Sequence, residues 1–360
     1  MLSNVEKAIL FVSTCDFIGA KKQYKIVTET NLENLIENFS EFKQSLMGIL
    51  SQKEIEQMEN TFNLTNLNSY ITNLEKSNIK VVTIKSKTYP KLLKEITNPP
   101  IVLYAKGNVE LLNSTCVAIV GSRRASRYGK DVTEQFSKAI AESGVTIVSG
   151  LADGVDTFAH TACLNAKGKT IAVLGSGLNE IYPATNTNLA NKIVECDGLL
   201  ISEHKPNEKP QTYYFPIRNR IIAGLCKAVV ITEATEKSGS MHTKNYALDF
   251  GREVFAVPGR ITDIYSVGCN KIIKNCQSAI ALGPSDVLNF LGKNFVENKP
   301  NVVQYSLTDK IILDIIDVNE VHYEEILQKS GMDSKELNTA LIRLELKKLI
   351  KKLPGNFYSK

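Results

Sequence analysis

The 360-residue sequence contains no apolar run long enough to span a bilayer. Its N-terminal run LFVSTC, residues 10–15, is too short to do so, and the flanks of that run do not resemble a signal peptide. We therefore expect a cytoplasmic protein with no membrane partner.

The sequence also lacks a CxxC pair. It has seven cysteines, an odd number, and they are scattered along the chain. This pattern argues against both a disulfide framework and a zinc site. Most of them lie in apolar runs, where a thiol behaves as a small core residue. We expect reduced cysteines and no bound metal.

A large excess of one charge is absent as well. The formal net charge is only +5, from 43 basic and 38 acidic residues, and the 43% hydrophobic content is typical of a soluble globular protein. Uniform basicity therefore cannot attract a polyanion, and any such site must come from local clustering of charge.

Proline is missing from the first eighty residues, and apolar residues recur there at helical spacing, as at Leu32, Leu35, Ile36 and Phe39. This pattern predicts a small helical, SAM-like module over residues 1–80. From residue 81, VVTI has the composition of a strand, YPKLLKEITNPP that of a connection, and IVLYAKGN that of another strand.

Six short apolar runs then alternate with amphipathic stretches. The runs are CVAIV, VTIV, TIAVL, GLLIS, AVVIT and EVFAV, at 116–120, 145–148, 170–174, 198–202, 228–232 and 253–257. They are rich in β-branched residues and lack polar alternation, as strands buried on both faces do, and their spacing leaves room for crossover helices. We predict an α/β domain over 81–295, with an extended Rossmann-like, doubly wound parallel sheet.

The last sixty residues predict a separate small domain. Residues 294–306 are polar and contain Pro300, as a linker would. TDKIILDIID, VHYEEILQKSG and a stretch capped by Asp333 or Ser334 predict three helices, and Pro354-Gly355 predicts a hairpin. This order indicates a winged helix-turn-helix over 303–360.

The loop after the first core strand, GSRRASRYG, concentrates positive charge. Gly121 lets the backbone approach a ligand, and the start of the next helix offers free N–H groups and a positive dipole end to an anion. Arg123, Arg124 and Arg127 add charge at the same place. The alternative is an ordinary strand-to-helix turn with solvated arginines.

The loop after the fourth core strand combines basic and aromatic residues. In open doubly wound sheets the ligand lies at the switch point, which we expect between the ends of the first and fourth strands. This loop supplies Lys205, Lys209, Arg218 and Arg220, together with Tyr213, Tyr214 and Phe215. Cations that follow phosphates and rings that stack on bases suit single-stranded nucleic acid. Each ring can instead simply pack the loop onto the sheet.

A third loop follows the fifth core strand. Its Ser238, Gly239 and Ser240 precede a helix and can hold a phosphate with amides and hydroxyls, or serve only as a helix cap.

Signatures of a cofactor enzyme are missing. The first loop is not GxGxxG, no P-loop is present, and the second strand ends in Ser149-Gly150 where a dinucleotide enzyme carries a carboxylate. We interpret Asp153 and Asp156 as helix-start residues. The four histidines, His160, His204, His242 and His322, show no metal or triad spacing, so we expect structural or surface roles. We expect no cofactor and no catalytic residue.

Taken in order, these motifs resemble the DNA-processing protein A family, also called DprA or Smf. The resemblance spans about residues 89–275. The matching segments are YPKLLKEITNPPIVLYAKGN, VAIVGSRRASRYG, SGLADGVDTFAH, GKTIAVLGSGLNEIYPATN, LLISEH, FPIRNRIIAGL, SGSMHTKNYAL, GREVFAVPG and VGCNKIIKN. The chain departs from the family's pattern at HTKNYAL and KNCQSAIAL.

The resemblance implies a protein that coats and protects incoming single-stranded DNA in natural transformation and helps to load the RecA recombinase onto it. It also implies a homodimer, and a DNA pocket lined by Arg123, Arg124 and the stretch from Lys205 to Lys209. Together with the loops above, we predict DNA contacts at Gly121, Ser122, Arg123, Arg124, Arg127, Lys205, Lys209, Phe215, Arg218, Asn219, Arg220, Ser238, Gly239 and Ser240.

Two other functions stay open. One is a nucleotide-binding phosphoribohydrolase, similar to the Lonely Guy family, although SGSMHTKNYAL lacks the glutamate that such an enzyme needs. The other is a duplex-binding regulator that uses a basic cluster in the tail, or a tail that contacts proteins instead. That cluster comprises Arg343, Lys347, Lys348, Lys351 and Lys352.

Overall fold

The computed structural model describes residues 2–293, 306–316, 320–347 and 349–360. The chain forms two compact units, residues 1–295 and 296–360. The predicted linker at 294–306 falls almost entirely outside the described residues, as do the predicted domain boundaries at 295 and 303.

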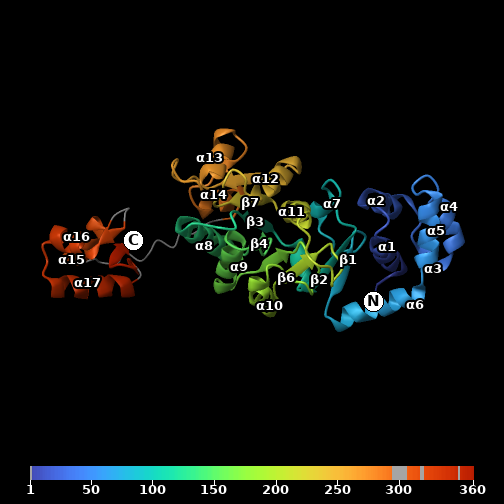
Figure 1. Cartoon of the computed structure of the whole chain (residues 1–360), viewed down its shortest axis with the longest axis horizontal. Coiled ribbons are helices and arrows are strands. Elements are labelled where there is room, and N and C mark those ends of the chain that lie inside the picture. The colour runs from blue at the N-terminus through green and yellow to red at the C-terminus, as the bar shows by residue number, and fades with distance from the viewer. Residues whose placement is uncertain (1, 294–305, 317–319, 348) are drawn as a thin grey trace. The chain divides into compact units, whose positions relative to one another are not determined.

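The predicted helical module forms six helices at one end of the first unit, coloured blue in Figure 1. They are α1 Asn4–Thr14, α2 Ala20–Glu29, α3 Glu33–Glu37, α4 Phe39–Ser45, α5 Gln52–Thr61 and α6 Leu64–Lys76. Ser3 with Glu6, and Ser51 with Glu54, form capping boxes that begin α1 and α5. The buried face of α1 packs against the first two strands, so the module shares one hydrophobic core with the sheet.

A nine-stranded sheet follows. Its strands are β1 Lys80–Thr83, β2 Val102–Gly107, β3 Cys116–Val120, β4 Thr146–Ser149, β5 Thr170–Val173, β6 Leu199–Ser202, β7 Ala228–Ile231, β8 Glu253–Ala256 and β9 Ala279–Ile280. Their order across the sheet is β1-β2-β6-β5-β4-β3-β7-β8-β9, with β1 and β2 antiparallel to their neighbours and the rest parallel. All six predicted core strands form, and β3 to β7 are buried along their whole length. The α/β fold class is confirmed.

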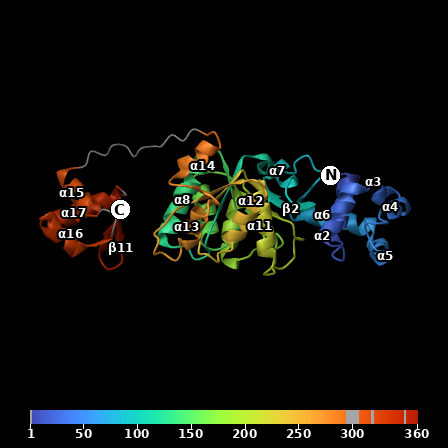
Figure 2. The same cartoon turned by 90° about the horizontal axis from the view of Figure 1, so that it is seen from above.

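Helices cover both faces of this sheet (Figures 1 and 2). The elements are α7 Lys91–Lys94, η1 Val109–Asn113, α8 Arg127–Glu142, α9 Val155–Asn165, η2 Ala184–Asn186, α10 Thr187–Glu195, α11 Tyr214–Leu225, α12 Ser240–Asp249, α13 Val267–Lys274 and α14 Pro284–Phe290. On one face α9 contacts α8 and α10, and α14 contacts α8. On the other face α11 packs against α7 and α12.

The switch point lies elsewhere than predicted. We expected the first core strand, β3, to neighbour the fourth, β6, but β3 pairs with β4 on one side and with the fifth, β7, on the other. The chain adds β4, β5 and β6 outward in one direction, and only α11 carries it back across the sheet to β7. The loops after β3 and β7 are therefore the direct neighbours, and the expectation about β6 was wrong.

The second unit is a winged helix with its own core. It contains α15 Leu307–Ile315, β10 Val321–His322, α16 Tyr323–Ser330, α17 Ser334–Leu346, β11 Lys351–Leu353 and β12 Phe357–Ser359. Gly331 ends α16 in the left-handed conformation, at φ 65°, and the Asp333 side chain caps α17. The predicted hairpin is the β11–β12 pair.

Among the described residues, the structure contains no helix long and apolar enough to cross a membrane, and no cluster of three or more His, Cys, Asp or Glu side chains arranged to hold a metal. All seven cysteines are free thiols, and five of them are buried.

Candidate nucleic-acid interface

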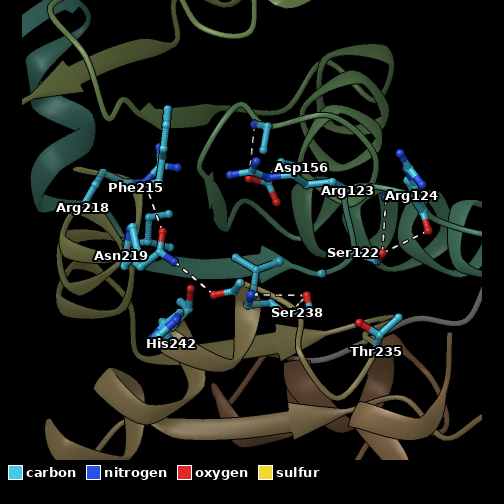
Figure 3. Close-up of a pocket in the computed structure, with 18 of the residues that line it drawn as sticks. Ser122, Arg123, Arg124, Asp156, Phe215, Arg218, Asn219, Thr235, Ser238 and His242 are labelled. Carbon is cyan, nitrogen blue, oxygen red and sulfur yellow. Dashed lines mark hydrogen bonds between the residues drawn. The ribbon is translucent and has the colours of Figure 1, made fainter. Parts of the chain in front are cut away.

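A cavity of about 660 Å³ opens at the carboxyl ends of β3 and β7. Figure 3 shows side chains from three segments around it: Ser122, Arg123 and Arg124 after β3, Phe215, Arg218 and Asn219 from α11, and Ser238 and His242 around the start of α12. Ten of the fourteen predicted DNA contacts line this cavity: Gly121, Ser122, Arg123, Arg124, Phe215, Arg218, Asn219, Ser238, Gly239 and Ser240.

The loop between β3 and α8, residues 121–126, presents two exposed cations, and we call it the arginine loop. The Ser122 hydroxyl donates to the Arg124 carbonyl at 3.0 Å and accepts from the Arg124 N–H at 3.2 Å, which closes a tight turn. Arg123 and Arg124 are exposed, and within the described part of the chain neither guanidinium forms a hydrogen bond or an ion pair with a carboxylate. Their charge is thus available to an anion.

The start of α8 is not available in the way that the sequence suggested. Ser126 caps the helix by accepting from the Gly129 N–H at 3.1 Å, and its own N–H and hydroxyl donate to the Glu233 carboxylate at 2.7 and 2.5 Å. Glu233 follows β7 and is only 1% exposed. An internal carboxylate therefore occupies the positive end of α8, and the expectation of free N–H groups there was wrong at Ser126 and Gly129.

Two opposite charges lie buried at the floor of the cavity. Arg218 donates to the carbonyls of Gly150, at 2.8 Å, and Val173. Asp156 accepts from the N–H groups of Gly150 and Ala152, at 3.0 and 3.3 Å. Burial lowers the pKa of Arg218 to about 10 and raises that of Asp156, and in each case the partner's charge opposes the shift.

These hydrogen bonds define what Asp156 does in the fold. It stands in the first turn of α9, as expected of a helix-start residue, and it also anchors the loop that leads into the helix. Asp153, just before α9, accepts from the Thr185 hydroxyl at 3.1 Å.

The three consecutive aromatic residues at the end of the 203–213 loop and the start of α11 separate in space. Phe215 enters the cavity, where the Arg123 guanidinium lies 5.5 Å and the Tyr182 ring 5.3 Å from its ring. Tyr213 and Tyr214 line a different hollow. Sequence reasoning missed Tyr182, which lines the cavity and is 46% exposed, although its place in EIYPATN after β5 was a usable signal.

The loop after β7 adds hydroxyls and a helix start. The hydroxyls of Ser238 and Ser240 lie 2.8 Å apart, and the hydroxyl and carbonyl of Ser238 accept from the N–H groups of Ser240 and Met241 at 3.4 and 3.0 Å. Asn219 donates to the Gly239 carbonyl at 3.3 Å and so links α11 to this loop. The first turn of α12 lines the cavity, so the positive end of its dipole lies beside the cavity although its first N–H groups bond within the loop. Thr235, His242 and Tyr265 also line the cavity and were not among the contacts predicted from the sequence.

Four predicted contacts lie outside the cavity. Lys205 and Arg220 line a second hollow of about 1100 Å³, between the N-terminal helices and the edge of the sheet. Arg220 is paired there with Glu203 at 2.6 Å. Arg127 lies 3.9 Å from Asp131 on α8, and neither it nor Lys209 lines either hollow.

Three of the four histidines occupy structural or surface positions, as predicted, whereas His242 lines the cavity. His160 is fully buried and lies 2.7 Å from the Thr170 hydroxyl, and His204 stacks on Tyr214 at 3.9 Å. His322 caps α16 by accepting from the Glu324 N–H at 3.3 Å.

Comparison with known families agrees with this arrangement. Residues 80–292 match the family of DNA recombination-mediator protein A, and residues 304–356 match the DprA winged helix domain. The chain belongs to this family. The predicted resemblance is therefore confirmed, on a match that covers more than half of the chain.

Curated relatives are similar over most of the chain. Protein Smf of Escherichia coli is 38% identical over 294 residues, which cover 79% of this chain and 78% of that protein. The DNA processing protein DprA of Bacillus subtilis is 46% identical over 203 residues, 56% of this chain and 68% of that protein.

Two solved structures share the fold. The structure of DNA processing protein A from Streptococcus pneumoniae has a TM-score of 0.69 at 34% identity, covering 80% of this chain and 98% of that one. DNA processing protein A from Helicobacter pylori, whose structure is described as showing a unique single-stranded DNA binding mode, has a TM-score of 0.53 at 31% identity, covering 59% of this chain and 95% of that one.

Proposed function

We propose that this protein binds single-stranded DNA in the cavity at the ends of β3 and β7, without making or breaking a bond. The observation that carries the proposal is the meeting of two exposed arginines, Arg123 and Arg124, which have no carboxylate partner in the described part of the chain, with aromatic rings and the start of α12 in one concave site. Phosphates bind the cations and the helix start, while Tyr182 offers an exposed face for a base.

The chemistry of the cavity favours a single strand over a duplex. Bases in a duplex are stacked on each other and cannot lie against Tyr182 or Phe215, whereas the bases of a single strand are free to do so. Support also comes from the related Helicobacter pylori protein, whose structure is described in terms of single-stranded DNA binding.

Family membership extends the proposal beyond binding. We propose that the protein acts in the cytoplasm during natural transformation, protects incoming DNA and helps to load RecA onto it. We also propose that it works as a homodimer, in which two cavities engage one strand. RecA-dependent strand exchange on DNA coated by a single-strand binding protein tests the loading role, and sedimentation tests the dimer.

The enzymatic alternative finds little support in the cavity. Asp156 is the one carboxylate among the described residues that line it, and its oxygen already accepts two backbone hydrogen bonds. A general acid or base must instead be free to exchange a proton with a substrate. We expect no hydrolysis of nucleoside monophosphates at high protein concentration, and robust turnover that is lost in Asp156→Asn would establish an enzyme.

A salt titration of oligo(dT) affinity tests the DNA site. For single strands, the logarithm of the binding constant falls with the logarithm of salt concentration by about 0.7 per phosphate neutralised. The double variant Arg123→Ala/Arg124→Ala should bind more weakly, with a slope that is smaller by about 1.4 if each arginine neutralises one phosphate.

Lys138→Ala is the matched control, because Lys138 is an exposed cation on α8 that faces Glu142 at 3.9 Å and does not line the cavity. It should keep the wild-type slope. An unchanged slope in the double arginine variant would show that DNA binds elsewhere.

The winged helix supports a second candidate function less well. Two cations of its predicted basic cluster, Arg343 and Lys347, lie 2.5 and 3.6 Å from oxygens of the buried Asp309. Lys348 lies outside the described residues. We expect removal of residues 303–360 to leave oligo(dT) affinity unchanged, and a selective loss of duplex affinity would assign duplex binding to the tail.

A further inference from the structure

The buried Glu233 is the feature that the proposed function does not use. It stands two residues after the end of β7, directly beneath the arginine loop, and is 1% exposed. Within the described residues its carboxylate forms no ion pair with a lysine or arginine. A buried carboxylate without a cation is costly unless hydrogen bonds compensate for it. Its contacts therefore indicate what it stabilises.

Those contacts all belong to the loop and helix that carry the arginines. The Glu233 carboxylate accepts from the N–H and the hydroxyl of Ser126, and its backbone carbonyl accepts from the Ser122 N–H at 2.8 Å. The arginine loop is thus attached to one residue at both of its ends, before Arg123 and after Arg124.

Two glycines, one in the arginine loop and one in α8, make this close approach possible. A Cβ on Gly129 would overlap a carboxylate oxygen of Glu233, and a Cβ on Gly121 would overlap its backbone carbonyl oxygen. The glycines of GSRRASRYG are therefore needed to leave room for Glu233, and not only for a ligand.

In doubly wound nucleotide-binding proteins, the helix after the first strand receives the pyrophosphate of the ligand at its N-terminus. Here the Glu233 carboxylate stands at that place on α8. It compensates the helix dipole from inside the protein, so phosphates of a ligand depend on the arginine side chains and on the start of α12.

We propose that Glu233 is a positioning residue for DNA binding: its carboxylate fixes the arginine loop in the geometry that directs Arg123 and Arg124 to the phosphates of the strand. The inference rests on the proposed function of the cavity. It requires Glu233 to act through its hydrogen bonds and not through its charge, since a negative charge near the cavity repels phosphate.

The sign of the effect separates these two roles. If only the charge of Glu233 mattered, Glu233→Ala and Glu233→Gln would both bind DNA more tightly than the wild type. If the hydrogen bonds position the loop, Glu233→Ala weakens binding. Glu233→Gln, whose amide oxygen still accepts from the Ser126 N–H, stays close to the wild type.

The experiment measures oligo(dT) affinity and its salt slope for full-length wild type, Glu233→Ala, Glu233→Gln and the double arginine variant, with circular dichroism to confirm folding. We expect the Kd of Glu233→Ala to rise by roughly tenfold, which corresponds to about 1.4 kcal/mol. We also expect a shallower salt slope, and a Kd for Glu233→Gln within about threefold of the wild type, or about 0.65 kcal/mol. In the Arg123→Ala/Arg124→Ala background, Glu233→Ala should have no further effect, because the groups that it positions are gone.

Ser126→Ala provides a second route if Glu233→Ala does not fold. It removes the hydroxyl that donates to Glu233 and should also raise the Kd and flatten the salt slope. Ser51→Ala is its control, since Ser51 caps α5 in the N-terminal module and truncation there costs helix stability without touching the arginine loop.

A folded Glu233→Ala, or Ser126→Ala in its place, that binds oligo(dT) as tightly as the wild type overturns the inference. If the wild type itself fails to bind, or the double arginine variant binds equally well, the proposed function fails instead.

Discussion

The Lys205 ammonium donates to both carboxylate oxygens of Asp16, at 2.7 and 2.6 Å, and to the Thr14 carbonyl at 3.2 Å. Asp16 follows α1, so these bonds attach the loop after β6 to the N-terminal module. A lysine that the sequence suggests for DNA thus connects two parts of the first unit.

We expect Lys205→Met to change oligo(dT) affinity by less than about twofold, because its charge is engaged outside the cavity. The same variant should loosen the N-terminal module, which limited proteolysis detects. The expected loss of stability is small, about 0.2–1 kcal/mol, since Lys205 and Asp16 are 34% and 81% exposed. Lys209→Met, at an exposed neighbour, should leave the proteolysis pattern unchanged. A loss of affinity in Lys205→Met as large as in Arg123→Ala would show that Lys205 does contact DNA.

Gly154 should tolerate no side chain. Its φ of 76° lies in the region that L-residues rarely adopt, and a Cβ there would overlap the carbonyl oxygen of Ser122. We expect Gly154→Ala to cost about 1–3 kcal/mol of stability in urea unfolding and to weaken DNA binding by displacing the arginine loop. Gly19→Ala is the matched control, because Gly19 also precedes a helix, at φ −65° and with open space around its Cα. Equal stability of the two variants would contradict this account.

His160 should make stability depend on pH. The Thr170 hydroxyl donates to the Ile147 carbonyl, so it accepts from the Nδ1–H of His160. Within the described residues Nε2 has no hydrogen-bond partner, so a second proton on Nε2 would find no acceptor. Burial first, and then the charge of Arg218, lower the pKa of His160 from 6.5 to about 3.

The direction of this dependence follows from the lowered pKa. Below pH 6.5 the unfolded chain binds a proton at His160 that the folded protein does not bind. The contribution of the neutral His160 to stability is therefore fully present above pH 6.5 and is lost as the pH falls from there toward 3. The slope from one such group approaches about 1.4 kcal/mol per pH unit. Urea unfolding at pH 7.5 and 5.5 should show a smaller pH effect in His160→Leu than in the wild type. Equal pH effects in both proteins would show that a group other than His160 takes up the proton on unfolding.

Lys244 and Gln277 should be energetically coupled. They come from HTKNYAL and KNCQSAIAL, the two stretches that depart from the family's pattern, and the Lys244 ammonium donates to the Gln277 side-chain oxygen at 3.0 Å. Lys244 is 7% exposed, and burial lowers its pKa.

Gln277→Ala leaves this ammonium without its acceptor, which costs about 1–3 kcal/mol. Lys244→Met should cost less, because methionine packs in the same space without a charge. Urea unfolding of both single variants and the double variant measures the coupling, and strictly additive effects would mean that the contact stabilises nothing.

The sequence alone was sufficient for the parts of this protein that depend on local pattern. Uninterrupted apolar runs such as CVAIV and AVVIT predicted buried strands because burial on both faces leaves no position for polar residues. The position of the charge at Arg123 and Arg124 could be predicted because a loop directly after a parallel strand must lie at the carboxyl edge of the sheet. Gly331 and Asp333 marked helix ends because capping requires particular residues.

Tertiary structure decided which of these local features meet. No pattern within a strand specifies its neighbour, so only the crossover through α11 placed β7 beside β3, and with it Glu233 beneath the arginine loop. The same long-range packing turned Lys205 toward Asp16 and brought Tyr182 to Phe215. A charge or a ring can be read from the sequence, but its partner comes from a distant part of the chain, and pairing determines whether the group is available to DNA or is already engaged within the protein.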